Sequence, residues 1–418
     1  MRILMVSDFY PPLLGGVEVF VRNLAVQLSA RGHEVAVATL RTGDLPGFEL
    51  VDGVRVHRIQ TTAQRAAWLF RHPTRPWAPP LPDPEATAAL QRIVARERPE
   101  IVHGHDWLAR CFLPLKPLGE ARLVMSLHYY TISCAKKTLM YRDAPCSGPG
   151  PAKCLACASS HYGVWKGPPI VLSNFAFAAF ERQAVDLFIP VSRATALGNG
   201  ISESDSPLEV IPSFVPDASE GNSHALDRFL TQLPAGDFML FVGDLRLFKG
   251  IAPLLEAYEC LHEPPPLVLV GKVWPETPDR LPSGVVVRRD WPNAAVLEAH
   301  RRALFTLVPS IWPEPFGLVI IEAMAAGRPV IGSRIGGIQE IIDDELTGLL
   351  VEPGDARALG AAMQRLLDDA GLREQMGQNA RGEAESYRAR TIVPRFERAY
   401  TSVLSSRGHR IAPSAART

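Results

Sequence analysis

The sequence has no excess of either charge, no long apolar run and few cysteines. Lysine plus arginine and aspartate plus glutamate each number 44, so the formal net charge is zero. This balance argues against nucleic-acid binding driven by overall charge, and we expect no nucleic-acid partner. No apolar run reaches the roughly 18 residues that a membrane-spanning helix needs. The first residues, MRILMVSDFYPP, predict a strand and not a signal peptide, so we expect a cytoplasmic protein.

Apolar stretches with strand-like and helix-like spacing alternate along both halves of the 418 residues. The expected strands include 2–6, 34–40, 122–127, 238–242 and 267–270, and the expected helices include 17–30, 251–262 and 355–369. Strands that alternate with helices predict parallel sheets covered on both faces. Periodicity lapses near 210–223, where turn-forming residues gather. We therefore expect an α/β protein with two doubly wound Rossmann-like domains, residues 1–213 and 214–389, facing across a ligand-binding cleft.

The segment EPFGLVIIEAMAAG, residues 314–327, is the most informative for function. Its apolar part, 316–327, predicts a buried helix in which Glu322 is costly to bury without a partner. Glu314 stands just before this helix, beside backbone N–H groups that attract anions. Two carboxylates placed in this way suit a sugar-nucleotide site, where acids bind hydroxyls and the helix N-terminus receives phosphate. A capping acid and a satisfied core glutamate are the alternative.

Two strand-to-helix loops are candidates for phosphate binding. Gly15 and Gly16 follow the first strand, and their lack of side chains lets backbone N–H groups approach a phosphate. A simple tight turn is the alternative, and the absence of a spaced GxGxxG pattern argues against a nicotinamide cofactor. In the second half, the loop FVGDLRLFKG carries Arg246 and Lys249, which either bind a diphosphate or remain solvated loop bases.

Three histidines lie at the ends of expected strands. His128 follows strand 122–127, and His103 and His105 end the strand before it. Because the carboxyl ends of parallel strands face the cleft, we expect all three in the cleft wall, with a structural role as the alternative. The spacing of His103 and His105 could suggest a metal, but no carboxylate motif completes such a site.

Together these features resemble the family-4 retaining glycosyltransferases of the two-Rossmann (GT-B) type. The most specific marker is a glutamate, seven residues and a second glutamate, which Glu314 and Glu322 satisfy. The segments SDFYPPLLGGVEVFVRNLA, FVGDLRLFKG, GSRIGGIQEII and TGLLVEPGD also match, and the resemblance covers nearly the whole chain. It implies that a last helix, residues 390–404, packs back on the N-terminal domain. The polar residues 405–418 predict a disordered tail.

The resemblance implies a nucleotide-diphosphate-sugar donor, expected to be a UDP- or GDP-sugar, held mainly by the C-terminal domain. It implies hexose transfer with retained anomeric configuration and without a catalytic metal. By position, Glu314 and His128 would lie at the donor sugar and Glu322 at the ribose. The remaining candidates at the diphosphate and the reacting sugar are Gly15, Gly16, Arg246, Lys249, Phe316, Gly317 and Leu318. The expected acceptor is a small molecule, a lipid-linked compound or a glycan.

Asp244 departs from the family pattern, which usually has arginine at this position. An acid at contact distance repels a diphosphate by about 1–4 kcal/mol, depending on screening. We therefore expect Arg246, in the same loop, to supply the missing charge. Two other functions would keep the fold: a nucleotide-sugar epimerase, and a non-catalytic sugar-nucleotide-binding protein, to which Asp244 points.

Four of the six cysteines fall in one segment, at Cys134, Cys146, Cys154 and Cys157. The last two have the spacing of a metal knuckle, and four thiolates suit tetrahedral zinc. Structural zinc, disulfides and unligated thiols all remain open, although a cytosolic location disfavours disulfides. An ordered knuckle here would shape the acceptor pocket, because the segment follows His128.

Residues 162–180, YGVWKGPPIVLSNFAFAAF, are rich in aromatic side chains and poor in charge. A segment of this composition could contact a lipid-linked acceptor or lie peripherally on a membrane surface. A place in the core or at a protein interface is the alternative.

Overall fold

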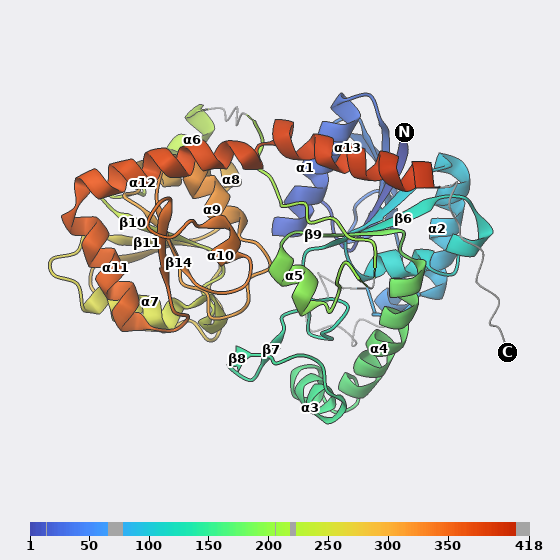
Figure 1. Cartoon of the computed structure of the whole chain (residues 1–418), viewed down its shortest axis with the longest axis horizontal. Helices are drawn as coiled ribbons and strands as arrows, with labels where there is room; N and C mark the ends of the chain where they lie inside the picture. The colour runs from blue at the N-terminus through green and yellow to red at the C-terminus, as the bar shows by residue number, and fades with distance from the viewer. Residues whose placement is uncertain (14, 66–77, 205, 218–222, 407–418) are drawn as a thin grey trace.

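The computed structural model describes residues 1–13, 15–65, 78–204, 206–217 and 223–406. Of the predicted tail, residues 407–418 lie outside the described residues. The chain forms two lobes, each built around its own parallel sheet, and the C-terminal helix crosses from one lobe to the other (Figure 1). No helix in the described ranges combines the length and apolar character needed to cross a membrane.

The N-terminal lobe contains a seven-stranded sheet with the order β3-β4-β2-β1-β5-β6-β9. Its strands are β1 (Arg2–Ser7), β2 (Glu34–Leu40), β3 (Phe48–Val51), β4 (Val54–Ile59), β5 (Ile101–Gly104), β6 (Arg122–Leu127) and β9 (Leu187–Pro190). All pairings are parallel except that between β3 and β4. A two-stranded hairpin, β7 (Met140–Tyr141) and β8 (Ala144–Pro145), lies outside this sheet.

Helices cover both faces of the N-terminal sheet, and its central strands are therefore apolar on both sides. Along β1, Ile3 and Met5 pack into the cluster that includes α1, whereas Leu4 and Val6 pack on the opposite face. The helical segments of this lobe are α1 (Gly16–Ala30), α2 (Pro84–Glu97), α3 (Pro151–Tyr162), α4 (Gly167–Ala184), α5 (Arg193–Gly198), and the short turns η1 (Ala63–Arg65), η3 (Trp107–Phe112) and η4 (Lys116–Leu118).

The C-terminal lobe has a six-stranded, wholly parallel sheet with the order β12-β11-β10-β13-β14-β15. Its strands are β10 (Met239–Val242), β11 (Leu267–Val270), β12 (Val285–Arg288), β13 (Thr306–Val308), β14 (Val330–Ser333) and β15 (Gly348–Val351). The helical segments are α6 (Ser223–Leu230), η5 (Leu247–Lys249), α7 (Ile251–Glu259), α8 (Asn293–Arg302), α9 (Leu318–Ala325), α10 (Ile338–Ile341), α11 (Ala356–Asp368), α12 (Ala370–Glu383) and η6 (Ala384–Tyr387), and they are followed by α13 (Ala389–Ser405). The predicted fold class, two doubly wound α/β units, is confirmed.

The chain passes between the lobes at two places that lie side by side. The amide of Val215 donates to the carbonyl of Tyr387 at 3.0 Å, and the amide of Ala389 donates to the carbonyl of Val215 at 3.0 Å. Beyond this crossing, Phe396 and Tyr400 of α13 are buried against Phe20 and the strands of the N-terminal sheet. The last helix thus packs back on the first lobe, as the resemblance implies, and it begins before residue 390.

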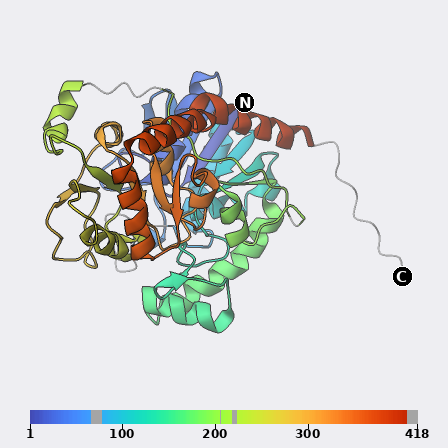
Figure 2. The same ribbon diagram turned by 60° about the vertical axis from the view of Figure 1, so that its left-hand side comes forward.

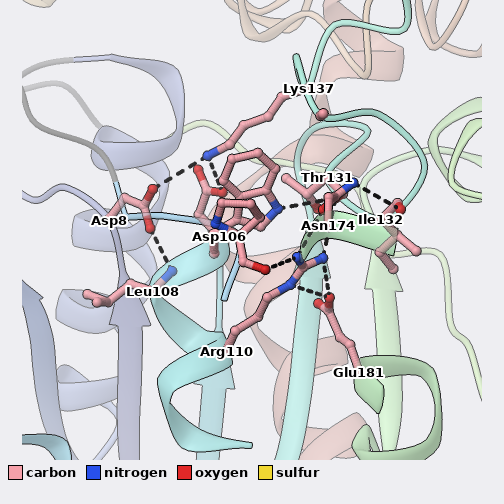
Figure 3. Close-up of polar contacts among 12 residues, drawn as sticks. Asp8, Asp106, Leu108, Arg110, Thr131, Ile132, Lys137, Asn174 and Glu181 are labelled. Carbon is pink, nitrogen blue, oxygen red and sulfur yellow. Dashed lines mark hydrogen bonds and ion pairs between the residues drawn. The ribbon is translucent and has the colours of Figure 1, made fainter. Parts of the chain in front are cut away.

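The helices α3 and α4 extend from the N-terminal lobe at the lower end of the molecule in Figures 1 and 2. A buried ion pair anchors this extension: the Arg110 guanidinium lies 2.8 Å from the Glu181 carboxylate of α4. Arg110 also donates to Asn174 Oδ1 at 2.9 Å, and both partners are shown in Figure 3. Because breaking a buried pair leaves an unpaired charge, this contact fixes α4 against the lobe.

Candidate active site

A cleft of about 570 Å³ lies between the lobes, at the carboxyl ends of the parallel strands. The N-terminal lobe lines it with Gly15, Gly16, Glu18, Phe20, His128, Tyr129, Lys136, Lys137 and Thr138, among others. The C-terminal lobe contributes Asp244, Phe248, Lys249, Ser310, Trp312, Glu314, Phe316, Gly317 and Leu318, among others. The structure therefore brings most of the sequence-predicted residues together, whereas Arg246 and Glu322 are not among those that line the cleft.

Two helix N-termini meet in this cleft. Gly16 is the first residue of α1 and Leu318 the first of α9, and a Cβ at Gly16 would stand 3.5 Å from Leu318 Cδ1. Gly317 ends the preceding loop with a left-handed φ of 116°, which explains why α9 begins at Leu318 and not at the expected residue 316. The unpaired N–H groups of both helix starts favour an anion between the lobes.

Glu314 is held by three donors from its own lobe. Its Oε2 accepts from Lys249 Nζ at 2.6 Å, from Trp312 Nε1 at 2.7 Å and from Ser310 Oγ at 3.2 Å. The side chains of Lys249 and Glu314 are 23% and 14% exposed, so the pair is accessible from the cleft. With its orientation set at Oε2, the carboxylate can offer Oε1 to a sugar hydroxyl, while Lys249 offers its charge to a phosphate.

The loop around Glu314 is also gripped from the N-terminal lobe. Tyr130 donates its hydroxyl to the carbonyl of Pro313 at 2.7 Å. Ser192 and Thr195 donate theirs to the carbonyl of Pro315 at 2.6 and 2.9 Å. These bonds fix the carbonyls on both sides of Glu314, so the position of its carboxylate depends on how the two lobes approach.

Beneath the same loop, two glycines allow close backbone contact. A Cβ at Gly336 would lie 2.3 Å from the carbonyl oxygen of Glu314, and Gly336 has a left-handed φ of 56°. A Cβ at Gly337 would lie 2.4 Å from the carbonyl oxygen of Pro315, and its amide donates to the Glu314 carbonyl at 2.7 Å. The segment GSRIGGIQEII therefore supports the Glu314 loop, because a side chain at either glycine would displace it.

The three predicted histidines form one buried cluster. His128 Nε2 and His105 Nδ1 are 3.1 Å apart, and His103 hydrogen-bonds Ser126 and the hydroxyl of Tyr400 on α13. Burial lowers the pKa of His128 to about 4, against a smaller opposing effect of Asp106. Of the three, only His128 lines the cleft, where a neutral imidazole can orient a hydroxyl by hydrogen bonding but carries no positive charge at neutral pH.

Glu322 lies in α9, one turn inside the helix. Its Oε1 accepts a hydrogen bond from Asn293 Nδ2 at 3.0 Å, which provides the partner that its position requires. Burial raises the pKa of this carboxyl to about 7, against the opposing effect of Asn293. The group therefore titrates near neutral pH, as carboxyl groups of functional sites often do.

Arg246 turns to its own lobe and not to the cleft. Its Nε lies 2.6 Å from Glu276 Oε1, and its guanidinium stacks over the rings of Phe248 and Trp274. Asp244 lines the cleft, as expected for the position after β10. The prediction that Arg246 compensates for Asp244 at a diphosphate stays a prediction, and it requires the pair with Glu276 to open.

Sequence reasoning missed Lys137, which lines the cleft, and the two acids that pair with it. Lys137 Nζ lies 2.5 Å from Asp106 Oδ1 and 3.5 Å from Asp8 Oδ2 (Figure 3). Burial raises the pKa of Asp8 to about 7, with Asp106 adding to the effect and Lys137 opposing it. Both acids follow strands, β1 and β5, so the rule that found the histidines could have found them. Lys137 offered no such signal, because it follows no strand.

The four clustered cysteines line one small cavity of about 30 Å³. All six cysteines of the chain are free thiols. Within the described residues, no three His, Cys, Asp or Glu side chains converge in the geometry of a metal site. The predicted zinc site at Cys134, Cys146, Cys154 and Cys157 thus stays a prediction.

Comparison with known proteins gives two family matches that together span both lobes. The family described as "Glycosyl transferase 4-like domain" matches residues 15–200, and "Glycosyl transferases group 1" matches residues 228–383. The chain is 45% identical over 408 residues to the N-acetyl-alpha-D-glucosaminyl L-malate synthase of Bacillus anthracis, covering 94% of this chain and 95% of that protein.

Two solved structures illustrate the shared fold. The sucrose-phosphate synthase from Thermosynechococcus elongatus superposes with a TM-score of 0.74 at 23% identity, covering 97% of this chain and 100% of that one. The Anabaena protein HepE, solved with UDP-glucose, gives a TM-score of 0.66 at 16% identity, covering 97% and 99%. The family matches, the relative of high identity and the two-lobed fold agree: the chain belongs to the family-4 glycosyltransferases of the GT-B fold.

Proposed function

We propose that this glycosyltransferase moves a hexose from a UDP- or GDP-sugar to an acceptor hydroxyl, with retention of the anomeric configuration and without a catalytic metal. The observation that carries the proposal is the Glu314–Lys249 pair, set in the cleft beside the N-termini of α1 and α9. Support for the donor class comes from the fold neighbour solved with UDP-glucose.

In the proposed reaction, the acceptor oxygen forms a bond to the anomeric carbon on the face from which the diphosphate leaves. The bond from that carbon to the diphosphate oxygen breaks, and its electron pair goes to the leaving phosphate. The acceptor proton passes to that phosphate, so no protein base is required. Lys249 and the two helix N-termini stabilise the charge on the diphosphate, while Glu314 holds donor hydroxyls. His128, neutral in the cleft, orients a hydroxyl.

For the acceptor we propose a small molecule that carries a negative charge. Lys136 and Lys137 line the N-terminal side of the cleft, where the acceptor would lie opposite the donor lobe. Lys137 is already paired with two acids, so Lys136 is the better candidate for a carboxylate or phosphate. The 45%-identical relative, whose name describes a malate product, supports an acidic acceptor.

The test is an assay with UDP-glucose, UDP-N-acetylglucosamine and GDP-mannose, each offered with a panel of hydroxy acids and sugar phosphates. We expect release of the nucleoside diphosphate that depends on one acidic acceptor. Transfer to uncharged glycans alone would contradict the proposed acceptor class. An epimerised sugar formed without acceptor would contradict transfer itself.

We also propose that a cytoplasmic enzyme of this kind touches a membrane through the α3–α4 extension. Trp165 is 89% exposed in the turn before α4, and Leu172 and Phe180 on that helix are 63% and 60% exposed. Residues 144–180 contain no aspartate or glutamate but include Lys153 and Lys166. Exposed apolar side chains beside lysines complement an anionic lipid surface.

A further inference from the structure

Outside the cleft, the fold gathers four cysteines from three different local structures. Cys134 lies in the turns after β6, Cys146 directly follows β8, and Cys154 and Cys157 lie in the first two turns of α3. Their separation in sequence reaches 23 residues, yet all four line the same cavity of about 30 Å³. We propose that these four side chains bind one structural zinc ion as thiolates.

Backbone amides lie beside two of the sulfur atoms. Burial raises the pKa of the Cys134 thiol, and hydrogen bonds from the backbone amides of Leu139, Lys136 and Thr138 oppose this rise. The amide of Gly150 donates to Cys154 Sγ at 3.4 Å. Amide donors of this kind are the outer contacts that stabilise metal-bound sulfur and set its direction.

The charges around the cavity also fit a metal–thiolate centre. Four thiolates around one Zn²⁺ carry a net charge of −2, which needs compensation in a partly buried place. Lys136 and Lys153 line the same cavity. Two disulfides would be neutral and would not use these lysines.

The segment between Cys134 and Cys154 has little regular structure. Lys137 ties it to Asp106 and Asp8, and the Tyr162 hydroxyl of α3 donates to the carbonyl of Ala135 at 2.8 Å. The regular structure of the segment is the short β7–β8 hairpin, and three non-glycine residues in it adopt left-handed backbone conformations: Lys137, Leu139 and Arg142. Such conformations persist only where the surroundings enforce them. Met140 packs with Tyr130 and Trp312 in the smallest of the apolar clusters in the described structure. A metal that joins this hairpin to α3 would add a further constraint to these contacts.

The sulfur atoms are not in ligating geometry in this structure, since no three candidate ligands of the described residues converge on one point. Rotation of a cysteine side chain between staggered conformers moves its sulfur by about 3 Å without moving the backbone. Binding therefore requires side-chain rotation into the cavity that the four residues already share. Cys146 and Cys157, whose thiols donate to the carbonyls of Gly148 and Met140, would exchange these weak bonds for zinc. Loading releases the four thiol protons to water.

Metal content tests this directly on the full-length protein, produced with zinc in the medium and purified without chelators. We expect about one zinc per chain, and Co²⁺ added to the reduced, metal-free protein should give the thiolate charge-transfer bands of a tetrahedral site. Cys157→Ser should lose the zinc. Cys260→Ser is the matched control, because Cys260 is exposed and distant in sequence from the cluster, and it should keep the zinc.

Zinc below about a tenth of an equivalent together with no thiolate bands from Co²⁺ would overturn the proposal, and so would disulfides among the four cysteines in protein kept reduced. The Co²⁺ titration uses the unaltered chain, so it decides the question even where the variant fails to fold. Because these readouts involve no turnover, they stand apart from the proposed function. If the zinc site and the proposed transfer reaction both exist, removing zinc should raise the acceptor KM more than the donor KM. The reason is that Lys136 and Lys137 belong to the segment that carries the cysteines.

Discussion

At the scale of single residues, Lys249 and Lys137 in the cleft are each paired with acids of the protein. A negatively charged substrate must replace such an acid as the partner of the lysine. Lys249 is neutralised by Glu314, and Lys137 by Asp8 and Asp106. A donor diphosphate that draws Lys249 away leaves Glu314 to Trp312 and Ser310, which keep the carboxylate in place. Exchange of partners within a partly buried site costs less than bringing a charge from water into it.

Removal of either member of the Lys249–Glu314 pair should reduce turnover without unfolding the protein. We expect Lys249→Ala and Glu314→Ala each to lower kcat by about 10²–10³-fold, the effect of removing one group that stabilises developing charge. Both residues line the cleft, where water can replace the lost partner, so the melting temperature should change by no more than about 2 °C.

The control for this pair is Arg365→Ala, which removes an exposed ion pair with Glu345 in the same lobe. Its turnover should equal that of the unaltered enzyme, because exposed pairs contribute little. A large drop in melting temperature for Lys249→Ala or Glu314→Ala would reassign that residue to the scaffold.

The pKa of Glu322, about 7, predicts that donor affinity depends on pH. Ribose hydroxyls donate to a carboxylate, so the donor favours the ionised form. From pH 8 to pH 6 the ionised fraction falls about tenfold, and the Kd for UDP-sugar should rise by up to about tenfold. Calorimetric titration at the two pH values measures this change.

Glu322→Gln should weaken donor binding at pH 8 and abolish its dependence on pH. The glutamine keeps the size of the side chain and its contact with Asn293 but does not titrate in this range. An unaltered enzyme whose Kd is the same at both pH values would contradict contact between Glu322 and the ribose.

At the scale of elements, the N-terminal end of the short helix α5 forms contacts between the two lobes. Its first amides, from Arg193 and Ala194, donate to the Glu340 carboxylate of the opposite lobe at 2.9 and 2.7 Å. Ser192, which precedes the helix, donates to Pro315 beside Glu314. One helix end therefore links the closure of the lobes to the loop that carries the chemistry.

Loss of the carboxylate from Glu340 should loosen this closure. We expect Glu340→Ala to raise the donor KM several-fold and to increase the radius of gyration measured by small-angle X-ray scattering. Asp355→Ala is the matched control, because Asp355 caps α11 within one lobe, by accepting from the Ala358 amide at 2.8 Å. It should cost about 1 kcal/mol of stability and leave the scattering unchanged. Equal radii of gyration for the two variants would contradict a role for Glu340 in holding the lobes closed.

The exposed side chains of α4 predict binding to anionic vesicles. Sedimentation with phosphatidylglycerol vesicles should recover the unaltered protein, and Trp165→Ser combined with Leu172→Ser should reduce that recovery several-fold, since both changes remove apolar area from the interface. Leu346→Ser is the control, because Leu346 is similarly apolar and 49% exposed but lies in the other lobe. Equal recovery of the unaltered protein, the double variant and Leu346→Ser would contradict membrane binding through α4.

The strand and helix periodicity of the sequence predicted much of the fold. The strands β2, β6 and β11 have the expected bounds, because their apolar runs end at polar or turn residues. The antiparallel strand β3 and the α3–α4 extension were not foreseen, since β3 is largely exposed and α3 has few buried residues, so neither has a clear apolar face. In the cleft, residues next to strand ends were predictable. The turn of Arg246 toward Glu276, 30 positions later, depends on a tertiary contact.

At the scale of the whole molecule, two lobes with independent sheets enclose one cleft, and α13 ties them together. Each lobe supplies a helix N-terminus, and the C-terminal lobe adds Lys249 and Glu314. The central claim is that this arrangement releases a diphosphate on the same face of the sugar that the acceptor attacks. Its consequence for the product is stereochemical.

The most direct test is the anomeric configuration of the first product, read by NMR from the one-bond coupling constant between its anomeric carbon and proton. With an α-linked UDP- or GDP-sugar and the acidic acceptor that supports turnover, the account predicts an α-linked product, formed together with one nucleoside diphosphate. A β-linked first product would contradict it.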